Sequence, residues 1–345
     1  MKYFTTLCMI LVGLLFATQT VAQNAEEKEL DMVFYNAENL FDTQDDPATM
    51  DEEFTPSGEK EWTRGRYNKK VKDVAKVLTS TDFDGIPEIV GLAEVENKRV
   101  LNALLRTEHF SGGYYGIVHK NSPDVRGIDV ALLYKTDAFK LLHKDFIPIQ
   151  FPFDKESKVR DILYAKGVAG NDTLHFFVNH WKSRAGGREE TEQKRTYSAR
   201  VLKAQIDSIL DVNADAKIVA MGDFNDEPTN KSLSKVLGAK NPMGDDKQAA
   251  LYNLMYPKDK EGKGTYSYKY EWFMLDNFIV SAACLGDNGY HTGPENVHIF
   301  DPPWVLYDDS KAGMKVPNRT YGGDNYFGGI SDHLAIYGVF KLSKN

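Results

Sequence analysis

The hydrophobic residues of the chain follow two recurring patterns, short apolar runs and apolar positions at helical spacing. Apolar positions three and four residues apart predict amphipathic helices over 66–80, 97–106 and 192–210. Short apolar runs bounded by turn residues predict strands, which cover 30–35, 86–95, 114–119, 129–134, 139–149, 162–168, 173–179, 216–221, 273–280 and 334–340. Polar and turn-forming residues dominate 42–66 and 284–329, so we expect both segments to be loops.

The order of these elements indicates the fold class. Some strands are separated by helices, while others follow one another directly along the chain. This mixture is typical of mixed sheets covered by helices on their outer faces and does not fit an all-parallel barrel. The chain has 345 residues, 42% of them hydrophobic and 27% charged, which is typical of a folded protein and not of a disordered one. No Pro-, Ser- or Gly-rich linker divides it, so we expect one domain over 24–345.

The first residues of the chain have the pattern of a targeting segment. Lys2 precedes an apolar run over 7–17, and small or polar residues then continue to Gln23. This pattern is typical of a secretory signal peptide, so we expect residues 1–23 to be removed and the mature protein to be periplasmic or secreted. The apolar run is too short to cross a bilayer, so we expect no stable membrane insertion; a short N-terminal anchor is the alternative. Cleavage leaves Cys284 as the one cysteine, without a partner for an internal disulfide.

The charge of the chain bears on its partners. The formal net charge of −8 does not favour nucleic-acid binding, because many nucleic-acid-binding domains are basic. The segment 180–203 nevertheless carries seven Lys or Arg residues and three acidic residues. Aromatic and basic residues do not interleave as they do in proteins that track a nucleic-acid strand, which favours a smaller substrate. We expect a monomer.

Polar side chains stand at the ends of five predicted strands. Loops at one end of a rigid sheet are where α/β proteins build their sites. The residues concerned are Asn36, Glu94, His180, Asp223 with Asn225, and Asp332 with His333. Each alone admits a structural explanation as a cap or turn residue, so their shared position is more informative than any single one.

Several of these residues suit metal binding and proton transfer. Glu94 is a hard oxygen ligand, suited to Mg²⁺ and also to Mn²⁺ or Ca²⁺. His333 can act as a general base towards water, because the ordinary pKa of histidine is about 6.5. It needs a carboxylate to fix its tautomer, and Asp276 is a good candidate because it begins a predicted buried strand. Asp332 projects away from its neighbour His333 and is expected to approach the metal.

Other residues suit the handling of a phosphate group. One of Asp223 and Asn225 can orient a nucleophilic water, while the other hydrogen-bonds a phosphate oxygen. His180, as a histidinium, can donate to a phosphate oxygen or to the leaving group. The guanidinium of Arg126 fits phosphate geometry, although a surface arginine is the plainer interpretation.

Five short motifs then resemble a known family. They are FYNAENLF at 34–41, LAEV at 92–95, GDFN at 222–225, LDNF at 275–278 and SDH at 331–333. Their order resembles that of the endonuclease/exonuclease/phosphatase superfamily, to which the pancreatic-type DNase branch belongs, over nearly the whole mature chain. The resemblance implies an α/β fold, a four-layer α/β sandwich of two packed mixed β-sheets flanked by helices. It also implies metal-dependent phosphoester hydrolysis by in-line attack of water.

The resemblance implies roles for individual residues. Carried over by position, the metal ligands are Glu94, Asn36 and Asp332, with Glu38 as a further candidate. The catalytic residues are His180, Asp223, Asn225, Asp276 and His333, and the phosphate-binding residues are Arg126 and Asn225. Histidine at position 180 is similar to the DNase-like branch, which holds it with an acidic partner. Asp124 and Asp129 are the candidates for that partner.

The leading functional hypothesis is a secreted, Mg²⁺-dependent endonuclease that hydrolyses phosphodiester bonds of DNA or RNA. The alternative is a phosphatase or phosphodiesterase that acts on a small molecule or a lipid headgroup. The apolar segment 304–307 is the one hint of a lipid contact. A non-catalytic binding protein on the same fold is a third hypothesis, which the complete set of polar positions disfavours.

Overall fold

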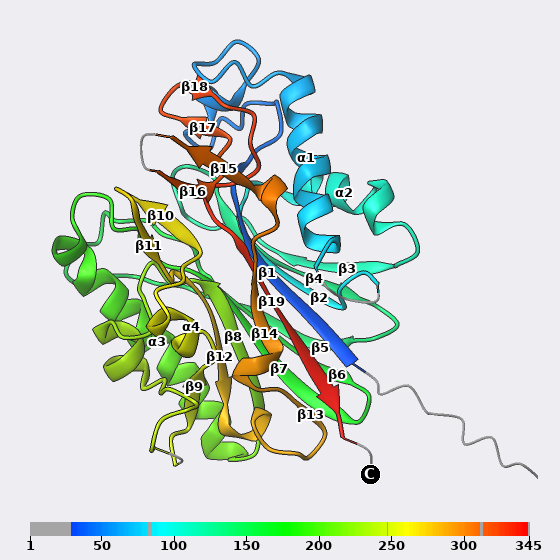
Figure 1. Ribbon diagram of the computed structural model, residues 1–345, viewed down its shortest axis with the longest axis vertical. Coiled ribbons are helices and arrows are strands. Elements are labelled where there is room, and N and C mark those ends of the chain that lie inside the picture. Colours follow the sequence, from blue (N-terminus) through cyan, green and yellow to red (C-terminus); the bar gives the residue numbers. More distant parts are fainter. Residues whose placement is uncertain (1–28, 82–84, 247, 311–312, 344–345) are drawn as a thin grey trace, which may run out of the picture.

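The fold is given by a computed structural model that describes residues 29–81, 85–246, 248–310 and 313–343. The expected signal peptide at 1–23 lies outside these residues. Two large mixed sheets form the body of the molecule (Figure 1). No helix in the described ranges is long and apolar enough to cross a membrane.

The first sheet has the strand order β13-β19-β1-β2-β4-β3, and β14 also pairs with β19. Its central strands β1 and β2 are parallel, and the other pairs are antiparallel. The strands are β1 (Glu29–Leu40), β2 (Ile89–Val95), β3 (Tyr115–His119), β4 (Asp129–Lys135), β13 (Tyr290–His291), β14 (Val297–Phe300) and β19 (Ala335–Leu342).

The second sheet has the order β5-β6-β7-β8-β12-β9. Here β7 and β8 are parallel, and the remaining pairs are antiparallel. The strands are β5 (Lys140–Ile147), β6 (Ile162–Ala169), β7 (Asp172–His180), β8 (Lys217–Asp223), β9 (Leu251–Asn253) and β12 (Asp276–Ser281). Each sheet therefore has one parallel pair near its centre, as the alternation of helices and strands predicts.

The main core lies between the two sheets, where Phe34, Leu132, Phe176, Met221 and Ile336 pack together. Because these strands are buried on both faces, their sequences are apolar runs and not strict alternations. Two further cores lie on the outer faces of the sheets, under the helices that cover them.

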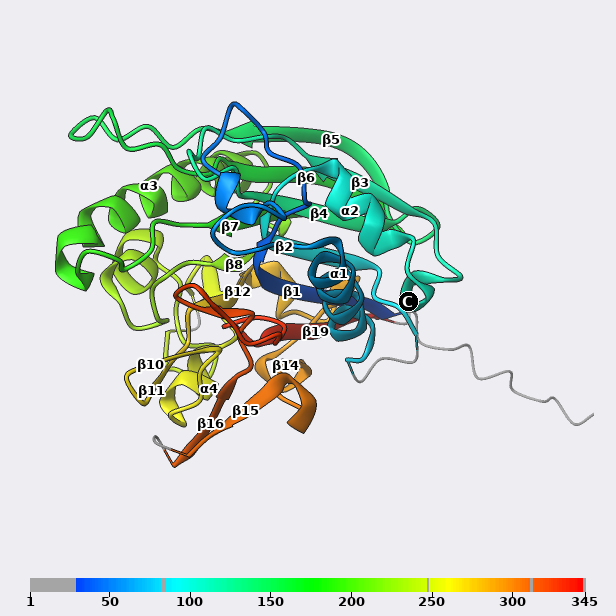
Figure 2. The same ribbon diagram turned by 90° about the horizontal axis from the view of Figure 1, so that it is seen from above.

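The helices complete the four layers (Figures 1 and 2). Helices α1 (Arg64–Thr79) and α2 (Lys98–Leu105) cover the first sheet, and α3 (Arg188–Val212) covers the second. Thr63 caps α1 and Asn97 caps α2 through side-chain oxygens that accept backbone N–H groups. The predicted four-layer sandwich is confirmed.

The segment 284–329 is not the set of loops expected from its composition. Besides β13 and β14 it contains two small hairpins, because short strands tolerate the many turn residues between them. These are β15 (Leu306–Asp309) with β16 (Met314–Pro317), and β17 (Tyr321–Gly322) with β18 (Asn325–Tyr326). The predicted strand 273–280 is also interrupted: hairpin β10 (Tyr266–Tyr268) and β11 (Glu271–Phe273) ends before β12 begins at Asp276.

The segment 42–66 is irregular, as predicted, but it has a core of its own. The rings of Phe41 and Phe54 stack at 4.3 Å, and Trp62 donates its indole N–H to the carbonyl of Phe41 at 3.1 Å. Tyr321 of the β17–β18 hairpin completes this cluster. The long loop is therefore fixed to the C-terminal hairpins that stand beside the ends of the central strands.

Candidate active site

Asp223, the last residue of β8, is the centre of a cluster of buried polar side chains. The pairing register of the second sheet places His180 of β7 and Asp276 of β12 beside it, one on each neighbouring strand. The imidazole Nε2 of His180 lies 3.6 Å from Oδ2 of Asp223. The strand ends that carry these polar residues in the sequence thus meet at one end of this sheet, on three neighbouring strands.

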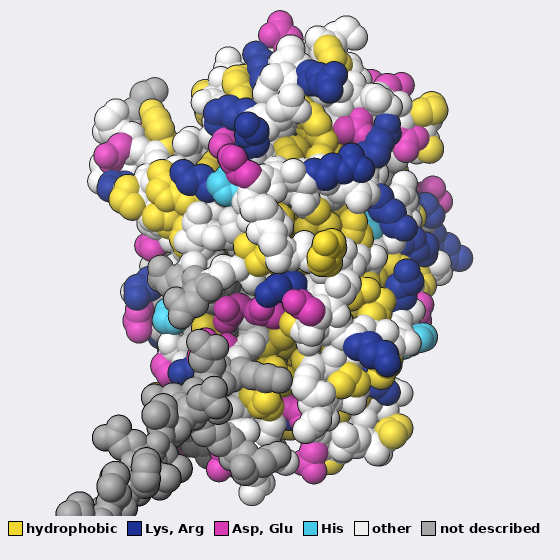
Figure 3. Space-filling model, turned by 90° about the vertical axis from the view of Figure 1, so that its right-hand side faces the viewer, with side chains coloured by type: hydrophobic (Ala, Val, Ile, Leu, Met, Phe, Trp, Pro, Cys, Tyr) yellow, Lys and Arg dark blue, Asp and Glu magenta, His cyan; other side chains and the backbone are white. Residues whose placement is uncertain are grey.

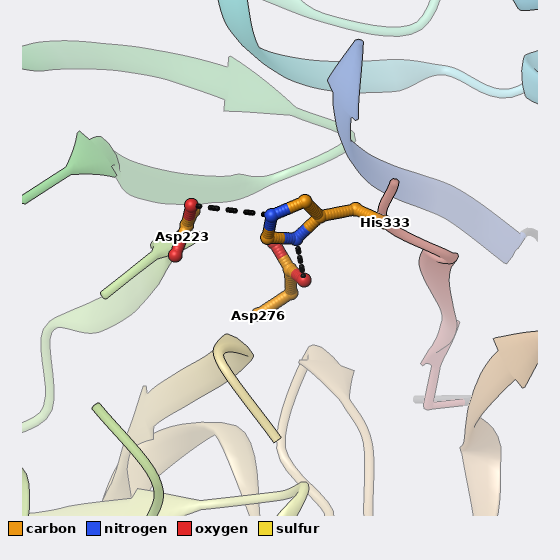
Figure 4. Close-up of side chains that lie close together, drawn as sticks. All are labelled: Asp223, Asp276 and His333. Carbon is orange, nitrogen blue, oxygen red and sulfur yellow. Dashed lines mark hydrogen bonds and ion pairs between the residues drawn. The ribbon is translucent and has the colours of Figure 1, made fainter. Parts of the chain in front are cut away.

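His333 completes this cluster from the segment before β19 (Figure 4). Its Nδ1 lies 2.7 Å from Oδ2 of Asp276, and its Nε2 lies 3.7 Å from Oδ2 of Asp223. Burial alone would lower the pKa of His333, but the carboxylates of Asp276 and Asp223 raise it well above its ordinary value. In this arrangement the imidazole carries a proton at neutral pH.

The carboxyl group of Asp223 has a raised pKa of about 7, because it is buried, although the charge of His333 opposes the shift. The neighbouring charges of Asp276 and Glu94 raise it further. His180 shows the opposite effect, since burial and then the positive charges of Arg160 and Arg126 hold its pKa well below the usual value. His180 is therefore neutral, whereas the sequence suggested a histidinium.

Glu94 and Asn36 reach the cluster from the first sheet through irregular backbone. The pairing of β1 with β2 shifts register after Asn36, and the pairing of β2 with β4 shifts at Glu94, which has a φ of 59°. Such bulges turn a side chain out of the regular alternation. Glu94 Oε1 lies 3.7 Å from His180 Nε2, and Asn36 donates through Nδ2 to Asp223 Oδ2 at 3.1 Å.

These residues suit a divalent cation. Asp223 and Asp276 each offer a carboxylate oxygen within 4.8 Å of the other, beside the protonated His333, and Glu94 adds a carboxylate to the same cluster. The carboxylate oxygens are hard ligands, and the pKa of Asp223 is raised to about 7 first by burial and then by the charges of Asp276 and Glu94, which crowd the same site. Asp276 Oδ1 is buried and lacks a hydrogen-bond partner within the described residues. A cation would relieve this crowding, so the donor set fits the metal expected from the sequence.

Asp332 and Glu38, the other expected metal contacts, have protein partners. Asp332 lies 3.4 Å from the Nη2 of Arg319. Glu38 accepts the backbone N–H of Thr320 at 2.7 Å, and burial, together with the charge of Asp332, raises its pKa to about 7. Glu38 therefore fixes the segment before the SDH motif, and Asp332 lies near enough for its charge to raise the pKa of Glu38.

Asn225 and Arg126, the expected phosphate contacts, differ in their burial. Asn225 is buried with a φ of 51°, donates through Nδ2 to the carbonyl of Trp181 at 3.2 Å, and donates its backbone N–H to Asp223 Oδ1. The side chain of Arg126 is 49% exposed and lies 3.4 Å from Asp124 Oδ1. Arg126 stands at the edge of the cluster, close enough to lower the pKa of His180.

The expected acidic partner of His180 is neither of the two candidates. Asp129 lies 3.1 Å from His119, and Asp124 lies 2.8 Å from Arg160. Among the residues that the structure describes, the carboxylates beside His180 are Glu94 and Asp223.

Three residues near the cluster went unrecognised in the sequence. Arg160 is buried and donates to the backbone carbonyls of His180 and Trp181, so it fixes the end of β7. The ring of Tyr266 lies 5.0 Å from the ring of His333, and Arg319 pairs with Asp332. None of the three belongs to a motif. The one signal in the sequence was the position of Arg160, just before a predicted strand.

Comparisons with known proteins identify the family and agree with the fold. The Endonuclease/Exonuclease/phosphatase family pattern matches residues 31–343. No curated protein matches the sequence. A D. rerio TDP2 structure complexed with single strand DNA product is 16% identical, with a TM-score of 0.56 over 91% of this chain and 99% of that one.

Two further solved structures share the fold. Truncated Caenorhabditis elegans TDP2 is 17% identical, with a TM-score of 0.55 over 91% of this chain and 97% of that one. A mannosyl-6-phosphatase from Bacteroides thetaiotaomicron is 16% identical, with a TM-score of 0.55 over 91% of this chain and 100% of that one. At such identities the likeness concerns the fold alone. The sequence match over almost the whole described chain goes further: this protein belongs to the endonuclease/exonuclease/phosphatase family.

Proposed function

We propose that this phosphoesterase is an exported, Mg²⁺-dependent endonuclease that hydrolyses phosphodiester bonds of DNA or RNA. The observation that carries the proposal is the meeting of Glu94, His180, Asp223, Asp276 and His333 around one point. Phosphoester hydrolysis needs an activated water, donors for the phosphate oxygens and charge neutralisation, and this cluster offers all three.

The directions of the pKa shifts indicate which side chain accepts a proton and which donates to the phosphate. Asp223, with a pKa of about 7, is basic enough to accept a proton from water near neutral pH. His333 is protonated in this arrangement, so its Nε2–H can donate to a phosphate oxygen while Asp276 fixes the ring. This exchanges the roles expected from the sequence, where His333 is the base. Asn225 orients Asp223 through its backbone N–H.

His180 and the metal complete the proposed chemistry. Neutral His180 can donate a hydrogen bond to the leaving oxygen, whose proton then comes from water, and Arg160 holds His180 in place through its backbone carbonyl. A divalent cation held by Glu94 would neutralise charge on the phosphate oxygens and leave Asp223 free to accept the proton. Asn36 contributes by donating to Asp223, which keeps that carboxylate turned towards the cluster.

The proposal is tested with purified mature protein, plasmid DNA and RNA, each with Mg²⁺ or with EDTA. We expect metal-dependent internal cutting of at least one nucleic acid. His333→Ala should abolish cutting without changing the melting temperature. If neither nucleic acid is cut under any metal condition, the endonuclease proposal is wrong.

A small-molecule phosphoesterase is the second candidate. The net charge of −8 favours it, as does the shared fold of the Bacteroides thetaiotaomicron mannosyl-6-phosphatase. Phosphate release from sugar phosphates or nucleotides, with DNA and RNA intact, would support it. A lipid headgroup is less well supported, because Val305 is buried and Lys76 lies 4.2 Å from the Trp304 ring.

A further inference from the structure

In the β10–β11 hairpin, with the sequence YSYKYEWF at 266–273, aromatic residues alternate with polar ones, of which Lys269 is basic. It lies beside β16 at the end of the sandwich that carries the strand-end cluster (Figures 1 and 2). We propose that one face of this hairpin, together with Arg319, binds the nucleotide next to the scissile bond of a single-stranded nucleic acid. This inference rests on the proposed nuclease function and specifies its substrate.

One face of the hairpin is turned towards the reaction centre. The ring of Tyr266 lies 5.0 Å from that of His333, and the two residues also form a backbone bridge. Phe273 is directly opposite Tyr266, and Arg184 lies 5.3 Å from its ring. Because side chains alternate along a strand, Tyr268 and the opposite Glu271 share this face, whereas Trp272 points away and packs on the outer core.

The tip of the hairpin is exposed and strained. Tyr268 is 54% exposed and Tyr270 is 63% exposed. Lys269 and Tyr270 form the turn with φ values of 49° and 71°, a conformation for which two-residue hairpins normally use Asn or Gly. Strain of this kind tends to be kept where it serves a function. Lys269 lies 5.3 Å from the ring of Tyr268, and the two exposed tyrosines beside it offer rings on which a base can stack.

Arg319 supplies a cation on the same side of the centre. Its guanidinium lies 3.4 Å from Asp332 Oδ2, and a hydrogen bond from Arg319 acts against the burial that raises the pKa of Tyr266. The flanking backbone is fixed, since Thr320 donates to Glu38 and Ile330 donates to the carbonyl of Asn318. A guanidinium with five N–H donors has spare capacity for a phosphate oxygen.

These features together favour a single strand. A base can stack on a protein ring only when it is not stacked and paired in a duplex. The rings and the guanidinium therefore match an unpaired base and its adjacent phosphate beside the reaction centre.

The first test compares Tyr268→Ala with Tyr307→Ala, a matched tyrosine on β15 that is 57% exposed. The substrates, with Mg²⁺, are a thymidine 12-mer and a 12-mer of abasic tetrahydrofuran units with the same charge. We expect Tyr268→Ala to lower kcat/KM about tenfold on the thymidine strand, the size of effect that base–aromatic stacking gives, and to leave the abasic strand unaffected. Tyr307→Ala should alter neither.

The second test concerns Arg319. Arg319→Gln should raise KM for the thymidine 12-mer several-fold, but not for thymidine 5′-(4-nitrophenyl) phosphate, which has one phosphate group. Arg106→Gln, at the exposed end of α2, is the control. An equal effect of Arg319→Gln on both substrates would mean that Arg319 does not contact a second phosphate.

The outcomes separate the inference from the function on which it rests. If wild-type protein cuts no nucleic acid, the endonuclease proposal fails and the inference fails with it. If wild-type protein cuts nucleic acid but prefers duplex, or if Tyr268→Ala matches Tyr307→Ala on both strands, the inference alone is overturned.

Discussion

Asp276 holds His333 through one short contact, and this contact can serve either catalysis or only the stability of the fold. If Asp276 fixes and charges the imidazole, Asp276→Asn should lower kcat by about two to four orders of magnitude, because the ring loses its orientation and its proton. The melting temperature should change little. Activity on nucleic acid at saturating substrate and a thermal melt measure the two effects.

The chain offers a matched control at Asp129. This buried carboxylate lies 3.1 Å from His119, in a similar pair outside the contacts of Asp223. Asp129→Asn should therefore leave kcat within a few-fold of wild type. Equal losses in the two variants would show that the Asp276 effect is structural.

Glu96 allows a test of charge burial away from the cluster. Burial raises its pKa to about 7, and the nearby charge of Asp42 adds to this. A carboxyl group with a raised folded pKa destabilises the fold above that pKa, and stability returns as the pH falls through about 7 towards the unfolded value. Glu96→Gln should thus raise the free energy of unfolding at pH 8, by roughly 3 kcal/mol at most, and have no such effect at pH 5.

Denaturant unfolding at several pH values measures this difference, and Glu108→Gln, at an exposed position, is the control. A gain for Glu96→Gln that stays the same from pH 5 to pH 8 would contradict the raised pKa.

Individual site residues were predictable where a strand ends in a polar residue or a short motif. His333 and Asp276 could be paired before their contact was known, because each stands at the start or end of a predicted strand. Protonation states could not be predicted: His180 is neutral because it is buried and because Arg160 and Arg126 lie near it, and Arg160 is 20 residues away in the sequence. Contacts of that kind depend on how loops fold, and local sequence does not encode them.

At the scale of elements, Lys70 joins three segments. Its buried ammonium on α1 donates to the carbonyl of Glu38, the hydroxyl of Thr320 and the carbonyl of Ile330. Lys70→Met should leave these buried acceptors without a donor and lower the free energy of unfolding by about 3–5 kcal/mol. Denaturant unfolding checks this, with the exposed Lys72→Met on the same helix as the control. A loss below about 1 kcal/mol would contradict it.

Elements with strong periodicity were predictable, and those held by tertiary contacts were not. The stripe of Val71, Val74, Ala75 and Leu78 identifies α1 because it faces the first sheet. The hairpins after residue 284 have strands of two to four residues, too short for any period to appear in the sequence. They form because the loop 42–63 and the end of β14 give them surfaces to pack on.

At the scale of the whole molecule, the charge is unevenly distributed. The chain carries −8 overall, yet α1 has the sequence RGRYNKKVKDVAKVLT, with six basic residues and one acidic residue. Figure 3 shows Lys and Arg side chains gathered on the face that lies on the side of α1 and α2 in Figure 1. The net charge therefore does not describe every face of the molecule, because the acidic residues concentrate elsewhere, including the cluster around Asp223.

Because negative charge is concentrated around Asp223, metal binding should raise the stability of the folded protein as well as support its activity. A cation that binds the folded state and not the unfolded chain raises the melting temperature as its concentration increases. We expect the melting temperature in EDTA to rise by several degrees when Mg²⁺ is added in excess. The gain should be largest above pH 7, where Asp223 loses its proton, and smaller near pH 5.5. Glu94→Gln should remove most of the gain, whereas Glu108→Gln should keep it. A Mg²⁺ effect of equal size in both variants would place the cation away from Glu94, and the oxygen donors at the ends of β2 and β8 would then need another explanation.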